Sequence, residues 1–204
     1  MSKRFGFLCF EGMEELDLIG PWEMAGIWKD FSAGPQLLTV GQKTGLVTCN
    51  HGLQINVQYD FFDCPSIDYL LIPGGKGARI QRYDDATLQF IRDFYAHGES
   101  LLSVCTGLFI LYETGLVKGK KATTYHLVKN EYKNLSDVHM MDARYVRDGK
   151  IWTSAGVSAG IDMMLAFISS IAGEETAGQV QYLSEYYPEQ KIYQFYQPPP
   201  NYHH

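Results

Sequence analysis

The sequence predicts a single α/β domain, built on a mainly parallel sheet with helices on both faces. Short, nearly continuous apolar runs end in glycine or turn residues, which is typical of strands covered on both faces. Between two of these runs lies a segment with helical periodicity, which predicts a strand, a helix and a parallel strand joined by a right-handed crossover. At 204 residues the chain is long enough to bury one large core.

The first half of the chain supplies most of the predicted sheet. Three apolar runs are predicted to form buried strands: Arg4–Phe10, Asp68–Pro73 and Ser100–Val104. Residues Gln36–Phe61 are rich in β-branched side chains and broken by KTG and NHG, which predicts strands joined by tight turns. The segment Asp84–Gly98 has apolar residues at helical spacing and ends at a glycine, which predicts the crossover helix.

The second half is predicted to complete the sheet and cover it. Ala143–Gly156 has strand character around an Asp-Gly turn. Ser158–Gly173 is apolar almost all round and predicts a buried helix, and Glu174–Tyr187 predicts a last amphipathic helix. We therefore assign residues 1–187 to one domain. Residues 188–204 form a proline- and tyrosine-rich tail that extends neither a helix nor a sheet.

Composition excludes several classes of function. The formal charge of −6, without a basic cluster, argues against a nucleic-acid partner. No apolar run approaches the length of a membrane span, and the first residues lack a leader pattern, so we expect a cytoplasmic protein. The four cysteines contain no CxxC pair and are expected to be reduced. Neither a nucleotide-binding glycine motif nor a metal-ligand spacing is found, so no cofactor or metal is expected.

Cys105 is the strongest candidate for a reactive group. It follows the predicted strand Ser100–Val104 and precedes the apolar helical pattern of Gly107–Gly115. Ligands of α/β sheets collect at the carboxyl ends of strands, and a nucleophile at a strand-to-helix turn is exposed there as a nucleophile elbow. Gly107 would permit the close packing of that turn. The helix N-terminus would favour the thiolate, so we expect an activated cysteine. Cys9, by contrast, fits a buried core position.

Several segments together resemble the ThiJ/PfpI superfamily of class I glutamine-amidotransferase-like proteins, and most closely its isonitrile hydratase branch. The matching segments are FEGMEELDLIGPWE, LIPGG, SVCTGLFILYETGLVKGKKATTYH, TSAGVSAGID and QVQYLSEY. The resemblance implies a flavodoxin-like sandwich and a homodimer. It also implies a cofactor-independent hydro-lyase that converts an isonitrile, a small electrophilic substrate, into an N-substituted formamide.

By resemblance, Cys105 would be the nucleophile and Asp17 the general acid and base. A carboxyl beside a thiolate is expected to have a raised pKa. Glu14 and Glu15 are competitors for the role of acid, because other branches of the superfamily place a glutamate near the cysteine. The backbone N–H groups of Gly75 and Thr106 are expected to face the developing negative charge.

Further residues are candidates for the pocket, and some features depart from relatives. Gly74, Val157 and His126 are possible pocket residues. His126 lies one residue after the position where many relatives carry a histidine, and Tyr125 occupies that position, so His126 is not assumed to reach Cys105. Thr106 replaces the histidine that follows the cysteine in proteolytic members, which argues against a Cys-His protease.

Two other functions stay open for the same site. Glyoxalase or deglycase chemistry also uses a cysteine with a nearby acid. A redox sensor, a small-ligand-binding domain or a stress protein would use an accessible thiol of low pKa, with Cys105 oxidising to a sulfinic acid held by neighbouring N–H groups.

Overall fold

The computed structural model describes residues 2–132, 135 and 137–187. The predicted tail, 188–204, lies outside these residues. Within them the chain forms a sheet of seven strands in the order β10-β11-β7-β6-β1-β2-β5. All neighbouring strands in this sheet are parallel except β10 and β11. The predicted fold class, a flavodoxin-like sandwich with a mainly parallel sheet, is therefore confirmed.

The bounds of the main strands agree closely with the apolar runs in the sequence. In sheet order they are β10 (Tyr145–Asp148), β11 (Ile151–Ser154), β7 (Ser100–Val104), β6 (Tyr69–Ile72), β1 (Arg4–Cys9), β2 (Gln36–Gly41) and β5 (Tyr59–Asp60). The residues of β6 and β7 are all buried, as expected for strands covered on both faces. Two small sheets stand apart in the described residues: β3 (Gly45–Thr48) with β4 (Gln54–Val57), and β8 (Lys121–Ala122) with β9 (His139–Met140).

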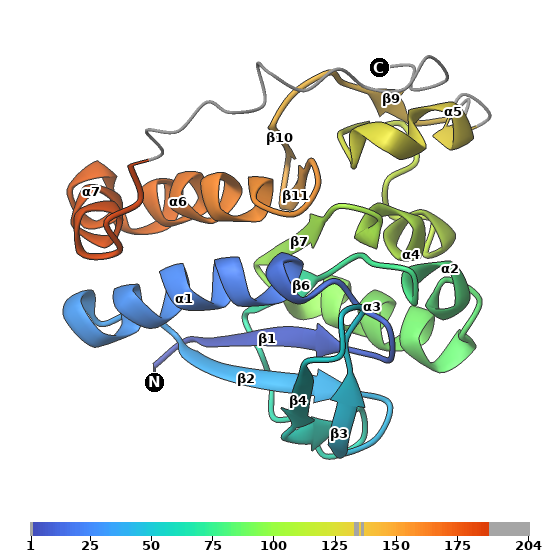
Figure 1. The fold of residues 1–204 in the computed structure, drawn as a ribbon, viewed down its shortest axis with the longest axis horizontal. Coiled ribbons are helices and arrows are strands. Elements are labelled where there is room, and N and C mark those ends of the chain that lie inside the picture. Colours follow the sequence, from blue (N-terminus) through green and yellow to red (C-terminus); the bar gives the residue numbers. More distant parts are fainter. Residues whose placement is uncertain (1, 133–134, 136, 188–204) are drawn as a thin grey trace.

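The helices form two groups, one on each face of the sheet. The first group contains α1 (Glu15–Ser32), α6 (Ala159–Ala172) and α7 (Glu174–Leu183), and Figure 1 shows α1 and α6 side by side. The second contains α2 (Ala78–Gln81), α3 (Asp85–His97) and α4 (Gly107–Glu113). From β1 the chain crosses through α1 to one side, and from β6 it crosses through α3 to the other. Right-handed crossovers in opposite directions place α1 and α3 on opposite faces.

Two remaining short elements, η1 (His126–Val128) and α5 (Lys129–Tyr132), follow β8. The crossover helix α3 begins as its sequence predicts, because the Asp84 side chain accepts a hydrogen bond from the Thr87 N–H at 2.8 Å. No helix in the described part of the chain is both long and apolar enough to cross a membrane.

Helix α1 is the longest of the described elements that the sequence did not predict. Gly20 and Pro21 lie inside it, and both residues usually interrupt helices. Tertiary packing explains them. A Cβ atom on Gly20 would lie 2.8 Å from Ile161, and one on Gly160 would lie 3.1 Å from Pro21. The two glycines thus allow α1 and α6 to approach closely.

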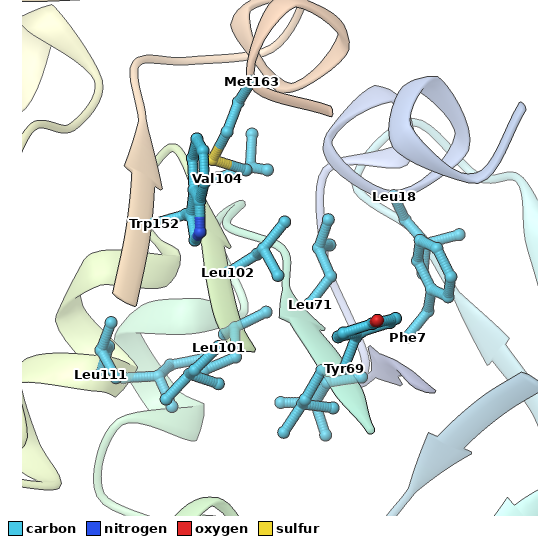
Figure 2. Close-up of a cluster of buried hydrophobic side chains, with 14 of the residues drawn as sticks. Phe7, Leu18, Tyr69, Leu71, Leu101, Leu102, Val104, Leu111, Trp152 and Met163 are labelled. Carbon is cyan, nitrogen blue, oxygen red and sulfur yellow. The ribbon is translucent and has the colours of Figure 1, made fainter. Parts of the chain in front are cut away.

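The core lies between the sheet and the α6 layer, and between the sheet and α4. Figure 2 shows Val104 and Trp152 of the sheet beside Met163 of α6, and Leu101 beside Leu111 of α4. Phe167 of α6 is fully buried at the centre of an aromatic cluster. Its ring lies 5.9 Å from Phe5, 6.4 Å from Trp28, 5.1 Å from Tyr69 and 5.7 Å from Trp152, measured between ring centroids.

Replacing Phe167 by alanine is expected to lower the free energy of unfolding by about 3–5 kcal/mol, because it removes a buried ring and leaves a cavity between four others. Urea denaturation followed by circular dichroism measures this change. The matched control is Phe62→Ala, since the Phe62 side chain is 94% exposed and its removal leaves no cavity. Equal unfolding free energies for the two variants would contradict this account of the core.

The sheet also fixes where a ligand can bind. The crossovers from β1 and β6 leave in opposite directions, so the gap between these strands is the topological switch point. The loops that follow the two strands meet there: the Glu14 N–H donates to the Gly74 carbonyl at 2.9 Å, and the Gly77 N–H donates to the Gly12 carbonyl at 2.9 Å.

Candidate active site

Cys105 lies at a tight turn between β7 and α4, next to the switch point. Its φ of 57° is in the left-handed region, which a non-glycine residue seldom adopts. The Cys105 N–H donates to the carbonyls of Ser154 and Ala155 at 3.2 and 3.3 Å, and the Thr124 hydroxyl donates to the Cys105 carbonyl at 2.7 Å. These bonds hold the strained backbone in place. A Cβ on Gly107 would lie 2.5 Å from the Ile72 carbonyl oxygen, so glycine is needed there as the sequence indicated.

Asp17 lies in the first turn of α1 and is fully buried. Its carboxylate accepts hydrogen bonds from the Gly74 N–H at 2.8 Å and from the Val157 N–H at 3.0 Å, and the side chain of Cys105 is close enough to lower its pKa. The structure therefore brings the predicted acid and the predicted nucleophile close together.

The pKa of Asp17 is raised to about 7. The main cause is burial, which penalises the charged form, and the hydrogen bond from the Gly74 N–H opposes it. The direction agrees with the sequence prediction but the cause differs, because the proximity of Cys105 lowers this pKa. A buried carboxyl with a pKa near neutrality can both accept and donate a proton at physiological pH.

The thiol itself is not activated in the way that the sequence suggested. The pKa of Cys105 is raised to about 12, first by burial and then by the negative charge of Asp17, although hydrogen bonds from Thr106 and from the Val157 N–H lower it. The start of helix α4 does not outweigh these effects. At neutral pH the pair thus holds its proton on sulfur when Asp17 is ionised, and loss of the thiol proton requires transfer to a neighbouring base.

Thr106 and Gly75 are linked to each other beside the pair. The Gly75 N–H donates to Thr106 Oγ1 at 2.9 Å, and Oγ1 lies 3.2 Å from the Gly75 carbonyl oxygen. The Gly75 N–H is thus already hydrogen-bonded, and its predicted role toward a developing negative charge stays a prediction that requires this bond to open. The backbone N–H of Thr106 is close enough to the Cys105 sulfur to lower the pKa of that thiol, so it can stabilise negative charge there.

Val157 completes the surroundings of the two side chains. It lies in the turn between β11 and α6 with a φ of 53°, which is unusual for a β-branched residue. This conformation accompanies an N–H that reaches both Asp17 and Cys105. The sequence indicated Val157 only as a possible pocket residue and not as a backbone donor to the site. No local pattern in the sequence reveals its backbone conformation.

A cavity of about 410 Å³ opens above Cys105, which is itself only 5% exposed. This volume lies within the usual range for small-molecule sites. The lining residues come from the ends of several strands: Glu14, Asn50, His51, Gly75, Lys76, Arg79, Cys105, Thr106, Tyr125, Val128 and Val157. Gly74, which was also predicted to be a pocket residue, does not line this cavity: it is buried, and its N–H donates to Asp17.

Tyr125, and not His126, lines this cavity. His126 is exposed, and its ring meets Tyr125 edge-on with the centroids 4.8 Å apart. A Cβ on Gly156 would lie 2.3 Å from the Tyr125 ring, so this glycine makes room for the aromatic side chain. The proposal that His126 is a pocket residue is thus not supported, because the chain turns Tyr125 inward at this position.

Of the two competing acids, Glu14 lines the cavity and Glu15 does not. Glu15 accepts hydrogen bonds from the His51 N–H at 2.6 Å and from His51 Nδ1 at 2.9 Å, while Glu14 accepts one from Asn50 Nδ2 at 3.0 Å. These bonds and the His51 imidazole lower the pKa of Glu15 against the effect of burial. Glu14, Glu15 and His51 place three potential metal-ligand atoms within 4.8 Å of one another, a grouping that their sequence spacing does not reveal.

Gly75→Ala is expected to lower the free energy of unfolding by far more than the loss of a glycine at positive φ does by itself. Gly75 has a φ of 111°, and an added Cβ would lie 2.3 Å from the Glu14 nitrogen and 2.6 Å from the Gly12 carbonyl oxygen. Gly45→Ala is the matched control, because Gly45 has the same φ and open space around it. We expect a loss of about 1–2 kcal/mol for Gly45→Ala and at least twice that for Gly75→Ala, measured by urea denaturation. Equal losses would contradict the close contact of these loops.

The fold and the site define a class: a flavodoxin-like α/β protein whose cavity, at the carboxyl ends of parallel strands, opens on a cysteine close to a buried aspartate. The DJ-1/PfpI family profile matches residues 3–170, and the chain belongs to the DJ-1/PfpI family.

Individual relatives agree with this assignment. The chain is 37% identical over 188 residues to an isonitrile hydratase from Pseudomonas putida, covering 92% of this chain and 80% of that protein. It is 29% identical over 150 residues to a deglycase from Thermococcus kodakarensis, covering 72% of this chain and 86% of that protein. Among solved structures, a ThiJ/PfpI family protein from Pseudomonas syringae superposes with a TM-score of 0.86 at 32% identity, covering 94% of this chain and 78% of that one.

Proposed function

We propose that this protein hydrates an isonitrile to an N-substituted formamide without a cofactor, using Cys105 as nucleophile and Asp17 as general base and acid. The observation that carries the proposal is the proximity of the two side chains beneath a small cavity. The 37% identity to an isonitrile hydratase adds support, because it extends over 92% of the chain.

The proton on sulfur has a defined path in this reaction. As the sulfur forms a bond to the isonitrile carbon, the thiol proton moves to Asp17. Asp17 then delivers the same proton to that carbon, which gives a thioimidate in which the carbon is bonded to sulfur, hydrogen and nitrogen. This sequence suits a carboxyl whose pKa is about 7, since it can take up and release a proton with little cost at neutral pH.

Water completes the conversion. It adds to the thioimidate carbon and loses a proton to Asp17, which passes that proton to the nitrogen. The carbon–sulfur bond then breaks, the hydroxyl proton moves through Asp17 to sulfur, and the formamide leaves. The net change is the addition of one water molecule. The N–H groups of Thr106 and Val157 stabilise negative charge on sulfur when it attacks and when it leaves.

The direct test is to incubate the purified protein with an aryl isonitrile and to measure the corresponding formamide by liquid chromatography. Formation of the formamide well above the rate in buffer supports the proposal. Absence of turnover with both aryl and alkyl isonitriles would overturn it. Lactate from methylglyoxal, measured in parallel, would instead favour glyoxalase or deglycase chemistry. Peroxide oxidation confined to Cys105, without turnover of any electrophile, would favour a sensor.

A further inference from the structure

Lys76 is a cation at the cavity above Cys105 whose charge has no partner in the described residues. It follows Gly75 in the loop after β6, is exposed, and lines the same cavity as Cys105. Its ammonium group takes part in no hydrogen bond or ion pair within the part of the chain that the structure describes. An exposed lysine is usually only hydrated, so what distinguishes Lys76 is that it lines the cavity that contains the Cys105 sulfur.

The other charged residues of the cavity are engaged with protein groups. Both terminal nitrogens of Arg79 bind the carboxylate of Glu131 at 2.6 Å, which compensates the Arg79 charge outside the cavity. Glu14 accepts a hydrogen bond from Asn50 at 3.0 Å, and its second oxygen lies 3.6 Å from His51 Nδ1. Lys76 is therefore the charged residue of the cavity lining whose charged group has no hydrogen-bond or ion-pair partner in the described residues.

The remaining walls suit the body of a small apolar ligand. Tyr125, Val128 and Val157 supply aromatic and aliphatic surface around the opening. A rigid ligand with its reacting carbon at Cys105 would extend along these side chains toward the rim. A negative group at its far end would be close to Lys76 and separated from the carboxylate of Asp17, which is buried beneath the cavity floor.

We propose that the cavity selects electrophiles that carry an anionic group, a carboxylate, at the end remote from the reacting carbon, and that Lys76 is the specificity-determining residue. The identity of the substrate rests on the proposed function. If that function holds, the proposal narrows the substrates to isonitriles that carry a carboxylate. The selection itself concerns access to Cys105 and can be measured without turnover.

The closing experiment compares alkylation of Cys105 by 4-(bromomethyl)benzoate and by 4-(bromomethyl)benzamide, which differ in charge and hardly in size and carry the differing group at the end remote from the reacting carbon. In both reactions sulfur forms a bond to the methylene carbon, bromide leaves with the bonding electrons, and the thiol proton is lost to solvent. Peptide mass spectrometry follows the rate at Cys105 separately from the rates at the other cysteines. The variants are Lys76→Met and, as matched control, Lys118→Met, because Lys118 is exposed and does not line the cavity.

We expect Lys76→Met to lower the ratio of the benzoate rate to the benzamide rate by about threefold, the size of effect that one solvated charge exerts at short range. High salt should reduce this difference, and Lys118→Met should leave the ratio unchanged. An unchanged ratio in Lys76→Met, or an equal change in Lys118→Met, would overturn the proposal.

A second arm separates this inference from the proposed function. Hydration of para-isocyanobenzoate is compared with hydration of its neutral methyl ester, and Lys76→Met is expected to lower kcat/KM about threefold for the acid only. An altered alkylation ratio with no hydration of either compound would retain the anion selectivity and reject the hydratase. Hydration of both compounds, with kcat/KM equally affected by Lys76→Met, would retain the hydratase and reject the anion selectivity.

Discussion

Replacing Cys105 by alanine is expected to lower kcat for isonitrile hydration by about ten-thousandfold, to the level of buffer, because no other group can form the carbon–sulfur bond. The side chain is small and lies at the edge of a cavity, so the fold should survive its truncation. Formamide production by the variant, measured at saturating isonitrile, gives the result. The unfolding midpoint in urea, measured alongside, shows that the loss is chemical.

Cys64→Ala is the matched control for this variant. Cys64 is a free cysteine that is more accessible than Cys105, and its sulfur donates only to the neighbouring Pro65 carbonyl at 3.4 Å. Its replacement is expected to leave kcat unchanged. Substantial turnover in Cys105→Ala, or an equal loss in Cys64→Ala, would contradict the assignment of the nucleophile.

Asp17→Asn is expected to lower kcat/KM by about a hundred- to a thousandfold, because the amide can neither take the thiol proton nor return it to carbon. The pH profile is the more specific readout. The pKa of Asp17 is raised to about 7, so in the wild-type protein the carboxyl is ionised, and able to accept the thiol proton, only above that pH. We therefore expect wild-type kcat/KM to fall about tenfold per pH unit below neutrality. The residual rate of Asp17→Asn should lack this dependence.

Two measurements separate this chemical role from a structural one. Asparagine offers a single oxygen to the N–H groups of Gly74 and Val157, so some loss of stability is expected, and assays are run well below the unfolding midpoint. Glu14→Gln is the control, because Glu14 is a carboxylate that lines the cavity, and because its negative charge raises the pKa of Asp17, its removal should shift the pH profile to lower pH without abolishing it. An unchanged pH dependence in Asp17→Asn, or its loss in Glu14→Gln, would identify another residue as the base.

The burial of the site explains why the pKa of Cys105 could not be predicted from its sequence position. The strand-to-helix turn was evident from the residues around Cys105, and the structure confirms a turn there. Whether such a turn favours a thiolate depends on solvent access and on neighbouring charges. Here burial and the Asp17 carboxylate outweigh the N–H groups, and both effects come from a helix and loops remote in sequence.

The same reasoning applies to the residues around the cavity. His126 and Tyr125 are adjacent, and only the path of the chain after β8 decides that Tyr125 turns inward. The grouping of Glu14 and Glu15 with His51, and the strained backbone of Val157, likewise depend on segments that meet only in the folded protein. No periodicity within one segment carries that information.

The sequence by itself determined the strands and most of the helices, because apolar periodicity and turn residues are local and the buried runs are long enough to be unambiguous. It also placed Cys105 at the end of β7 and singled out Asp17 among neighbouring acids through resemblance. Only the tertiary structure decided that Gly20 and Pro21 belong to a helix, because their cost to α1 is offset by close packing against α6. It also decided that Asp17 is buried against the sulfur, since desolvation and hydrogen bonding are properties of the assembled core and not of any one segment.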